Sequence, residues 1–185
     1  KLKLKEKIPD ITIKEDKNII LIANTFKQNI TTLSELENEC KNIILDKNLN
    51  IIVYTSNSLY YNDDAKYFTI NNNINEKYTK EIYESYEGTI LTVFYYDNNW
   101  YLSTRKCINA DLSKWYDKTY KNLFCDTIND TFENFTDKLN KNSYYSFVLV
   151  HYENKNIIDY SDRFGNNYKK LIHISTKNAK THEEI

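Results

Sequence analysis

Hydrophobic and polar residues alternate along several short segments of the chain, and this period of two is typical of half-buried strands. The predicted strands are residues 8–22 (as one or two strands), 42–45, 49–55, 89–96, 100–104, 145–150, 156–160 and 170–175. Polar turns separate residues 42–45 from 49–55 and residues 89–96 from 100–104, so we expect a hairpin at each of these two places. The sheets they form are expected to be antiparallel.

Two segments follow helical spacing instead. Thr32 and Glu35 form a capping-box pattern that predicts the start of a short helix, and residues 60–66 after it are loop-like. Apolar residues at steps of three and four predict a long helix over 117–139. Strands together with these helices indicate a single α+β domain covering residues 1–185.

Composition narrows the class of protein. The 185 residues are 41% hydrophobic and 28% charged, which suits a globular chain, and no apolar run approaches the roughly 20 residues of a membrane span. A net charge of −1 gives no overall attraction to nucleic acid, although 25 Lys and Arg leave room for a local basic groove. The three cysteines lack metal or redox spacing and the three histidines lack ligand spacing, so we expect reduced thiols, a cytoplasmic location and no metal site.

Glycine is scarce, with only two residues, while Asn, Lys, Ile and Tyr are abundant. These abundant residues have AT-rich codons, as expected for a large DNA virus or an AT-rich microbe. A viral source would place the protein in a viral factory or a virion. Where glycine persists against such a bias, at Gly88 and Gly165, we expect the backbone to need it.

Several segments resemble, in the same order, the adenylation domain of phage-type RNA ligases that repair cut tRNA. Glu87-Gly88 is similar to the end of that family's Lys-x-Asp-Gly nucleotidylation motif, in which Glu sometimes replaces Asp. The other matching segments are Glu39-Cys40-Lys41-Asn42-Ile43-Ile44, Ser103-Thr104-Arg105-Lys106, Phe147–Lys155 and Leu171–Glu184. Together they extend from about residue 35 to the end of the chain.

The resemblance implies a nucleotidyltransferase fold, with antiparallel sheets around a central groove and flanking helices. It also implies a domain that is incomplete at its C-terminus, because the family's last two motifs would follow Ile185. Active members use ATP or GTP with Mg²⁺. The candidate nucleotide- or RNA-binding residues that it suggests are Lys41, Ser85, Tyr86, Glu87, Gly88, Ser103, Arg105, Lys106, Asn154 and Lys155.

One departure decides the expected function: Ser85 stands where the family has its nucleophilic lysine. A serine hydroxyl cannot form the lysine phosphoramidate, and losing a covalent nucleophile costs many orders of magnitude in rate. We therefore expect no catalytic residue and a degenerate, ligase-like protein. Its ligand would be a nucleotide, an RNA 5′ end (capped ends included) or a protein partner.

Two alternatives stay open. An active ligase would need a displaced lysine, Lys41, Lys80 or Lys106, as nucleophile, and a structural or assembly subunit would keep the fold only as a scaffold. Several candidates also have plainer interpretations. Residues 103–106 can be a solvated strand end, Asn154 a turn residue, and His151 a hydrogen-bonded residue of the core.

Overall fold

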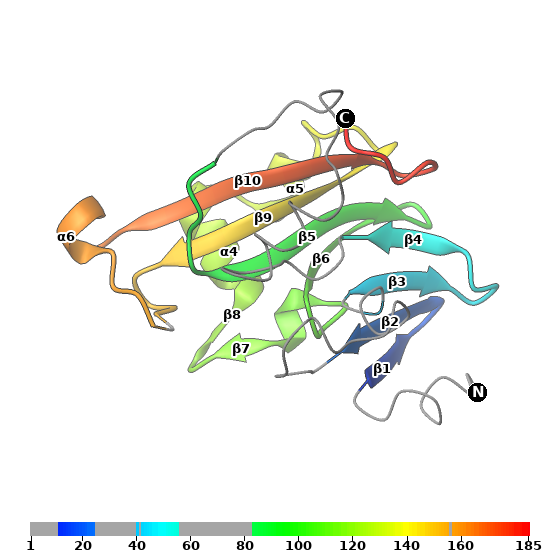
Figure 1. The fold of residues 1–185 in the computed structure, drawn as a ribbon, viewed down its shortest axis with the longest axis horizontal. Helices are drawn as coiled ribbons and strands as arrows, with labels where there is room; N and C mark the ends of the chain where they lie inside the picture. The colour runs from blue at the N-terminus through cyan, green and yellow to red at the C-terminus, as the bar shows by residue number, and fades with distance from the viewer. Residues whose placement is uncertain (1–10, 25–39, 41, 56–82, 156) are drawn as a thin grey trace, which may run out of the picture.

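The computed structural model describes residues 11–24, 40, 42–55, 83–155 and 157–185. Of these residues, 45% form strands and 16% form helices. The strands build two four-stranded antiparallel sheets and one small two-stranded sheet (Figure 1).

The first sheet has the order β1-β2-β3-β4 and consists of two hairpins. Its strands are β1 (Ile11–Asp16), β2 (Ile19–Asn24), β3 (Ile43–Asp46) and β4 (Ile51–Tyr54). Asp46 forms the second hairpin's turn, because its Oδ1 accepts hydrogen bonds from the backbone N–H groups of Asn48 and Asn50, each at 2.8 Å.

The second sheet has the order β10-β9-β5-β6. Its strands are β5 (Thr89–Tyr96), β6 (Asn99–Thr104), β9 (Ser143–His151) and β10 (Lys169–Asn178). Asp97 and Asn98 join β5 to β6 with φ of 48° and 59°, the left-handed conformation that a tight hairpin turn requires and that Asp and Asn tolerate.

The second sheet is the middle layer of the molecule. One face, with Leu91, Phe147 and Leu149, packs against the helices α4 (Tyr120–Ile128) and α5 (Phe132–Thr136). The opposite face, with Phe94 and Tyr144, packs against the first sheet. Because successive side chains of a strand point to opposite faces, this one sheet contributes to two hydrophobic cores.

The predicted α+β fold with flanking helices is wrong, and the protein is a β-rich structure in which antiparallel sheets dominate. The described residues hold three α-helices, and the third, α6 (Ser161–Phe164), is a single turn at the end of the molecule (Figure 1). The two longer described helices, α4 and α5, pack on the same core cluster.

The long helix predicted over 117–139 is two helices. Asn129 adopts the left-handed conformation (φ 52°) and ends α4, and the Thr131 side chain caps α5 by accepting a hydrogen bond from the Asn134 N–H. The first residues of that range form β8 (Lys118–Thr119), paired with β7 (Lys114–Trp115). The apolar spacing continued across the break because both helices use the same core.

Most predicted strands are confirmed, including both hairpins and the last strand, which becomes β10. The strand predicted over 156–160 is wrong, since residues 157–160 form a loop leading to α6. The helix predicted from Thr32 and the loop at 60–66 lie outside the described residues. None of the described helices is long and apolar enough to span a membrane.

Candidate functional site

A pocket of about 470 Å³ lies where β5 begins and β6 ends. Antiparallel pairing places these two ends together, with Leu91 opposite Thr104. The pocket is lined by Gly88, Thr89, Ile90, Thr104, Arg105, Lys106, Ser113 and Tyr120. Three of the residues predicted from the sequence, Gly88, Arg105 and Lys106, therefore share one pocket.

The lining suits an anion. Among the described residues, it offers two cationic side chains and four hydroxyl groups and no carboxylate. Arg105 donates from Nη2 to the Asn24 carbonyl oxygen at 3.3 Å, while its buried Nε has no partner among the described residues. Lys106 is exposed and forms no ion pair with the described part of the chain. An unpaired cation beside hydroxyl donors favours phosphate or a similar anion.

Position 88 requires glycine because strand β9 passes very close to its backbone. A Cβ at this position would lie 2.4 Å from the Leu149 carbonyl oxygen and 2.7 Å from Val148 Cγ1. The segment that precedes β5 therefore runs directly against β9, and this brings Thr89 and Ile90 to the pocket. Gly165 differs: it has φ 85° with open space around it, so its conformation needs glycine. The expectation that both glycines serve the backbone is confirmed.

Glu87 lies beside the pocket but does not line it. Its carboxylate accepts hydrogen bonds from the backbone N–H groups of Ile157 (3.1 Å) and Ile158 (2.7 Å). Its own N–H donates to the Tyr160 hydroxyl at 2.7 Å. The carboxylate thus holds the loop before α6, and Glu87 is not among the residues that line the pocket.

Ser85 and Tyr86 lie outside the pocket in the segment before β5, and Ser85 is exposed. The Tyr86 hydroxyl donates to Glu84 at 2.6 Å, and its ring lies 5.4 Å from the Arg163 guanidinium carbon. Hydrogen bonds from Arg163 and then from Tyr86 lower the pKa of Glu84 to about 2. Tyr86 therefore belongs to a charged and aromatic cluster around α6.

The remaining candidates have structural partners. Ser103 is fully buried on β6 and its hydroxyl faces the Thr92 carbonyl oxygen at 3.4 Å. Asn154 is buried and donates to Thr89 Oγ1 at 2.8 Å, so it positions a pocket hydroxyl. Lys155 pairs with Asp159 at 2.6 Å. Lys41 lies outside the described residues.

Sequence reasoning did not select Thr89, Ser113 and Tyr120. The sequence predicts Thr89 only as the first residue of a strand. Ser113 and Tyr120 meet because the Tyr120 N–H donates to the Ser113 carbonyl oxygen at 3.0 Å across the base of the β7–β8 hairpin. The sequence predicts a helix from residue 117 onward, so no sequence signal indicates this contact.

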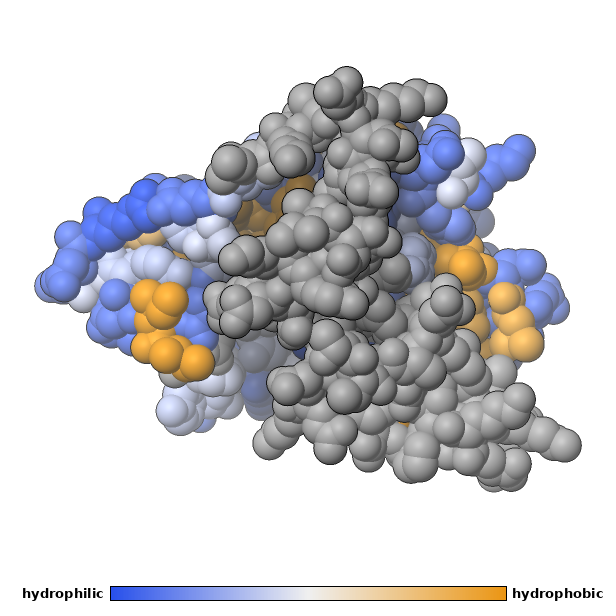
Figure 2. All heavy atoms as spheres, viewed as in Figure 1, coloured by the Kyte–Doolittle hydropathy of each residue, from blue (hydrophilic) through white to orange (hydrophobic). Residues whose placement is uncertain are grey.

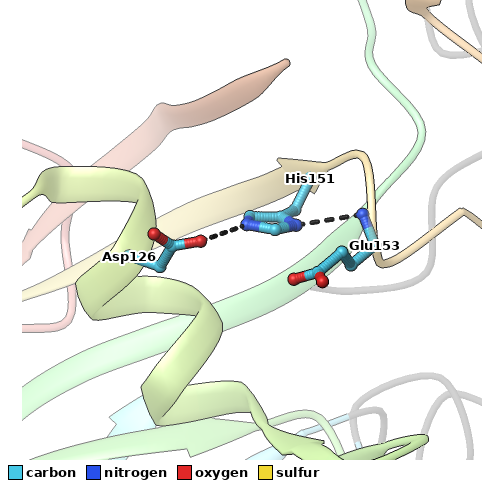
Figure 3. Close-up of side chains that lie close together, drawn as sticks. All are labelled: Asp126, His151 and Glu153. Carbon is cyan, nitrogen blue, oxygen red and sulfur yellow. Dashed lines mark hydrogen bonds and ion pairs between the residues drawn. The ribbon is translucent and has the colours of Figure 1, made fainter. Parts of the chain in front are cut away.

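A second cluster lies where α4 meets the end of β9 (Figure 3). The buried His151 donates from Nε2 to Asp126 Oδ2 at 2.9 Å, and its Nδ1 accepts from the Glu153 N–H at 3.1 Å. Asp126 also accepts from Lys169 at 2.7 Å, and Lys118 pairs with Glu153. Hydrogen bonds from Lys169 and then His151 lower the pKa of Asp126.

The three side chains offer ligand atoms within 4.8 Å of one another, a spacing that suits a metal ion. The hydrogen bonds argue against that use. Because Nδ1 of His151 accepts from a backbone N–H, the neutral ring carries its proton on Nε2, the nitrogen that faces Asp126. A metal there would require moving that proton onto Nδ1, against the Glu153 N–H. His151 is a hydrogen-bonded residue of the core, as its strand position predicted.

No protein-family model matches the chain. A curated relative, the immediate-early protein ICP-46 homolog of Invertebrate iridescent virus 3, is 36% identical over 83 residues. The matched segment is 42% of this chain and 18% of the relative, so the chain corresponds to less than a fifth of that protein. The similarity links this chain to a viral protein over part of its length.

Proposed function

We propose that the pocket at the β5 and β6 ends binds a phosphate-bearing ligand, a nucleotide or the 5′ end of an RNA, without covalent nucleotidyl transfer. The observation that carries this proposal is the lining itself: Arg105 and Lys106 line the pocket together with four hydroxyl groups, and none of its described lining residues is a carboxylate. Arg and hydroxyl donors are the usual protein partners of phosphate oxygens.

Two features support binding without covalent chemistry. Ser85, at the position of the family's nucleophile, is an exposed hydroxyl outside the pocket. The lysine that does line the pocket, Lys106, is exposed, whereas nucleophilic lysines are activated by desolvation or by a neighbouring cation. The neighbouring Arg105 is the one feature that favours the alternative, an active ligase that uses Lys106 with Mg²⁺ and ATP or GTP.

Titration of the protein with ATP, GTP and a 5′-phosphorylated RNA tests the proposal. We expect Lys106→Ala to weaken binding roughly 5- to 30-fold, because it removes a charge-assisted contact of about 1–2 kcal/mol. Lys138→Ala is the matched control, since Lys138 is 75% exposed and does not line the pocket. Equal affinity in both variants would contradict the assignment of the pocket.

Mass spectrometry after incubation with Mg²⁺ and ATP or GTP tests the absence of covalent transfer. We expect an unmodified polypeptide. A bound AMP or GMP that disappears in Lys106→Ala would establish the active ligase instead, and the noncovalent proposal would be wrong.

A protein partner is the second candidate ligand, and one observation favours it. The Glu87 carboxylate holds the loop before α6 so that Ile157 is 91% exposed and Ile158 47% exposed. Figure 2 shows hydrophobic surface at the same end of the molecule. Adjacent exposed aliphatic side chains supply apolar surface that a protein partner can cover. No response to any nucleotide or RNA, together with a stable co-purifying protein, would favour this candidate.

The partial similarity to an iridovirus protein supports a viral source for the chain. In that setting the proposed site of action is the cytoplasm of an infected cell, a viral factory or the virion. Phosphorylated RNA ends and nucleotides are available as ligands in each of the first two.

A further inference from the structure

The rim of the pocket carries a small hairpin formed by β7 and β8. It leaves the pocket wall at Ser113 and returns at Tyr120, and these two residues both line the pocket. Their backbones are joined by the 3.0 Å hydrogen bond from the Tyr120 N–H to the Ser113 carbonyl oxygen. The hairpin therefore projects from a fixed point of the pocket.

The turn of this hairpin presents an aromatic ring to solvent. Tyr116 is 85% exposed and adopts φ 52°, a conformation uncommon for a bulky residue. Its ring meets Trp115 edge-on at 5.7 Å between ring centroids, and Trp115 packs against the core of the second sheet. Tyr116 is thus held in place yet almost fully accessible, which is what a stacking platform requires.

The charge around the hairpin is favourable for a polyanion. Lys114 on β7 is exposed and, like Arg105 and Lys106, has no carboxylate partner among the described residues. Acidic groups are also present, and most are neutralised: Lys121 pairs with Asp111, and Lys118 with Glu153. Asp117, in the turn, is the exposed acid without a described ion pair.

We propose that the β7–β8 hairpin extends the phosphate pocket into a binding track for single-stranded nucleic acid. A phosphate occupies the pocket at Arg105 and Lys106, and a base of an adjacent nucleotide stacks on Tyr116. Tyr116 is three positions after Ser113, a backbone span of at most about 11 Å, so a ligand that touches the pocket wall at Ser113 can also reach Tyr116. This inference rests on the proposed function and specifies its ligand as a strand longer than a mononucleotide.

A protein could also cover Tyr116, but the surroundings favour nucleic acid. Stacking on an exposed aromatic beside unpaired cations is the usual way in which proteins hold single strands without reading their sequence. A protein partner would have to supply carboxylates for three separate cations, whereas a phosphate backbone supplies anions at regular spacing.

Two probes separate the pocket from the stacking platform. Inorganic pyrophosphate has no base and reports on the pocket, while a short 5′-phosphorylated single-stranded RNA reports on both. We expect Tyr116→Ala to weaken RNA binding roughly 5- to 150-fold, the range for loss of one stacked base, and to leave pyrophosphate binding unchanged. Tyr116→Trp should retain RNA affinity, and an abasic strand should bind the wild type and Tyr116→Ala equally.

Ile174→Ala provides the matched control, because Ile174 is an exposed apolar residue on β10, at the opposite edge of the sheet from β6. Circular dichroism of each variant verifies folding. Unchanged RNA affinity in Tyr116→Ala would overturn the proposed binding track. The proposed function of the pocket would still stand in that case if Lys106→Ala weakens the binding of pyrophosphate. Failure of wild-type protein to bind either probe would overturn both.

Discussion

At the scale of single residues, the pocket depends on one glycine whose role is steric. Gly88 has no positive φ, so its absence of a side chain matters only because β9 passes so close to it. The hydroxyl and backbone groups that begin β5 reach the pocket because of this approach. A glycine in a turn motif and a glycine at a close packing contact look the same in a sequence. Only the distances to the neighbouring atoms in the structure distinguish them.

Gly88→Ala should destabilise the protein by about 1–3 kcal/mol, the usual cost of overpacking, because the new methyl group would meet the Leu149 carbonyl oxygen. For a chain of this length the melting temperature should fall by about 2–4 °C per kcal/mol, which thermal unfolding followed by circular dichroism measures.

Val148→Ala in the Gly88→Ala background provides the control. It removes the Cγ1 contact but leaves the shorter contact with the carbonyl oxygen, so most of the destabilisation should persist. Full recovery of stability in the double variant would show that the side chain, and not the β9 backbone, makes glycine necessary.

At the scale of elements, strands were predictable and helices were not. The hairpins β3–β4 and β5–β6 followed from alternation and from polar turns, since both signals are local in the sequence, whereas residues 8–22 were predicted only as one or two strands. The helical range 117–139 failed because one core receives the apolar residues of both α4 and α5, so the spacing continues through their boundary. Asn129 ends α4 and Thr131 caps the start of α5, and such capping residues are only a weak signal in a sequence.

Asn129→Ala should destabilise the protein by about 1 kcal/mol, because alanine tolerates the left-handed conformation less well than asparagine. Asn129→Gly, which removes the Cβ, should be neutral or slightly stabilising. Urea denaturation of the three proteins measures the difference. A more stable Asn129→Ala variant would indicate that α4 and α5 can fuse into the single helix that the sequence suggests.

The candidate site was predictable only where its residues lie in a local sequence pattern. Arg105 and Lys106 lie at a strand end that the sequence identifies, and Gly88 stands out in a chain with two glycines. Ser113 and Tyr120 join the pocket through the β7–β8 hairpin, whose second strand lies in the range predicted as helix. Glu87 was identified as important, but its carboxylate holds the loop at Ile157, a contact 70 positions away that no local pattern encodes.

At the scale of the whole molecule, the two large sheets are joined by a buried phenol. Tyr144 on β9 is 1% exposed, donates its hydroxyl hydrogen to the Tyr54 carbonyl oxygen at 2.9 Å and accepts from the Tyr54 N–H at 3.4 Å. Lys177 on β10 adds contacts with the carbonyl oxygens of Tyr54 and Thr55. The end of β4 is thereby fixed to the second sheet, and the intersheet core around Phe94 is closed at this side.

Burial raises the pKa of Tyr144 to about 12, and this gives a pH-dependent test of the junction. In the unfolded chain the phenol ionises near pH 10, while in the folded protein it stays neutral until about pH 12. Stability from Tyr144 is therefore fully present below pH 10 and is lost as the pH rises towards 12. Tyr144→Phe should cost about 1–2 kcal/mol at neutral pH, because the Tyr54 backbone groups lose a buried partner. Its stability should also decline less steeply than that of the wild type between pH 10 and 12. Equal slopes in denaturant titrations across that range would show that the phenol does not hold the two sheets together.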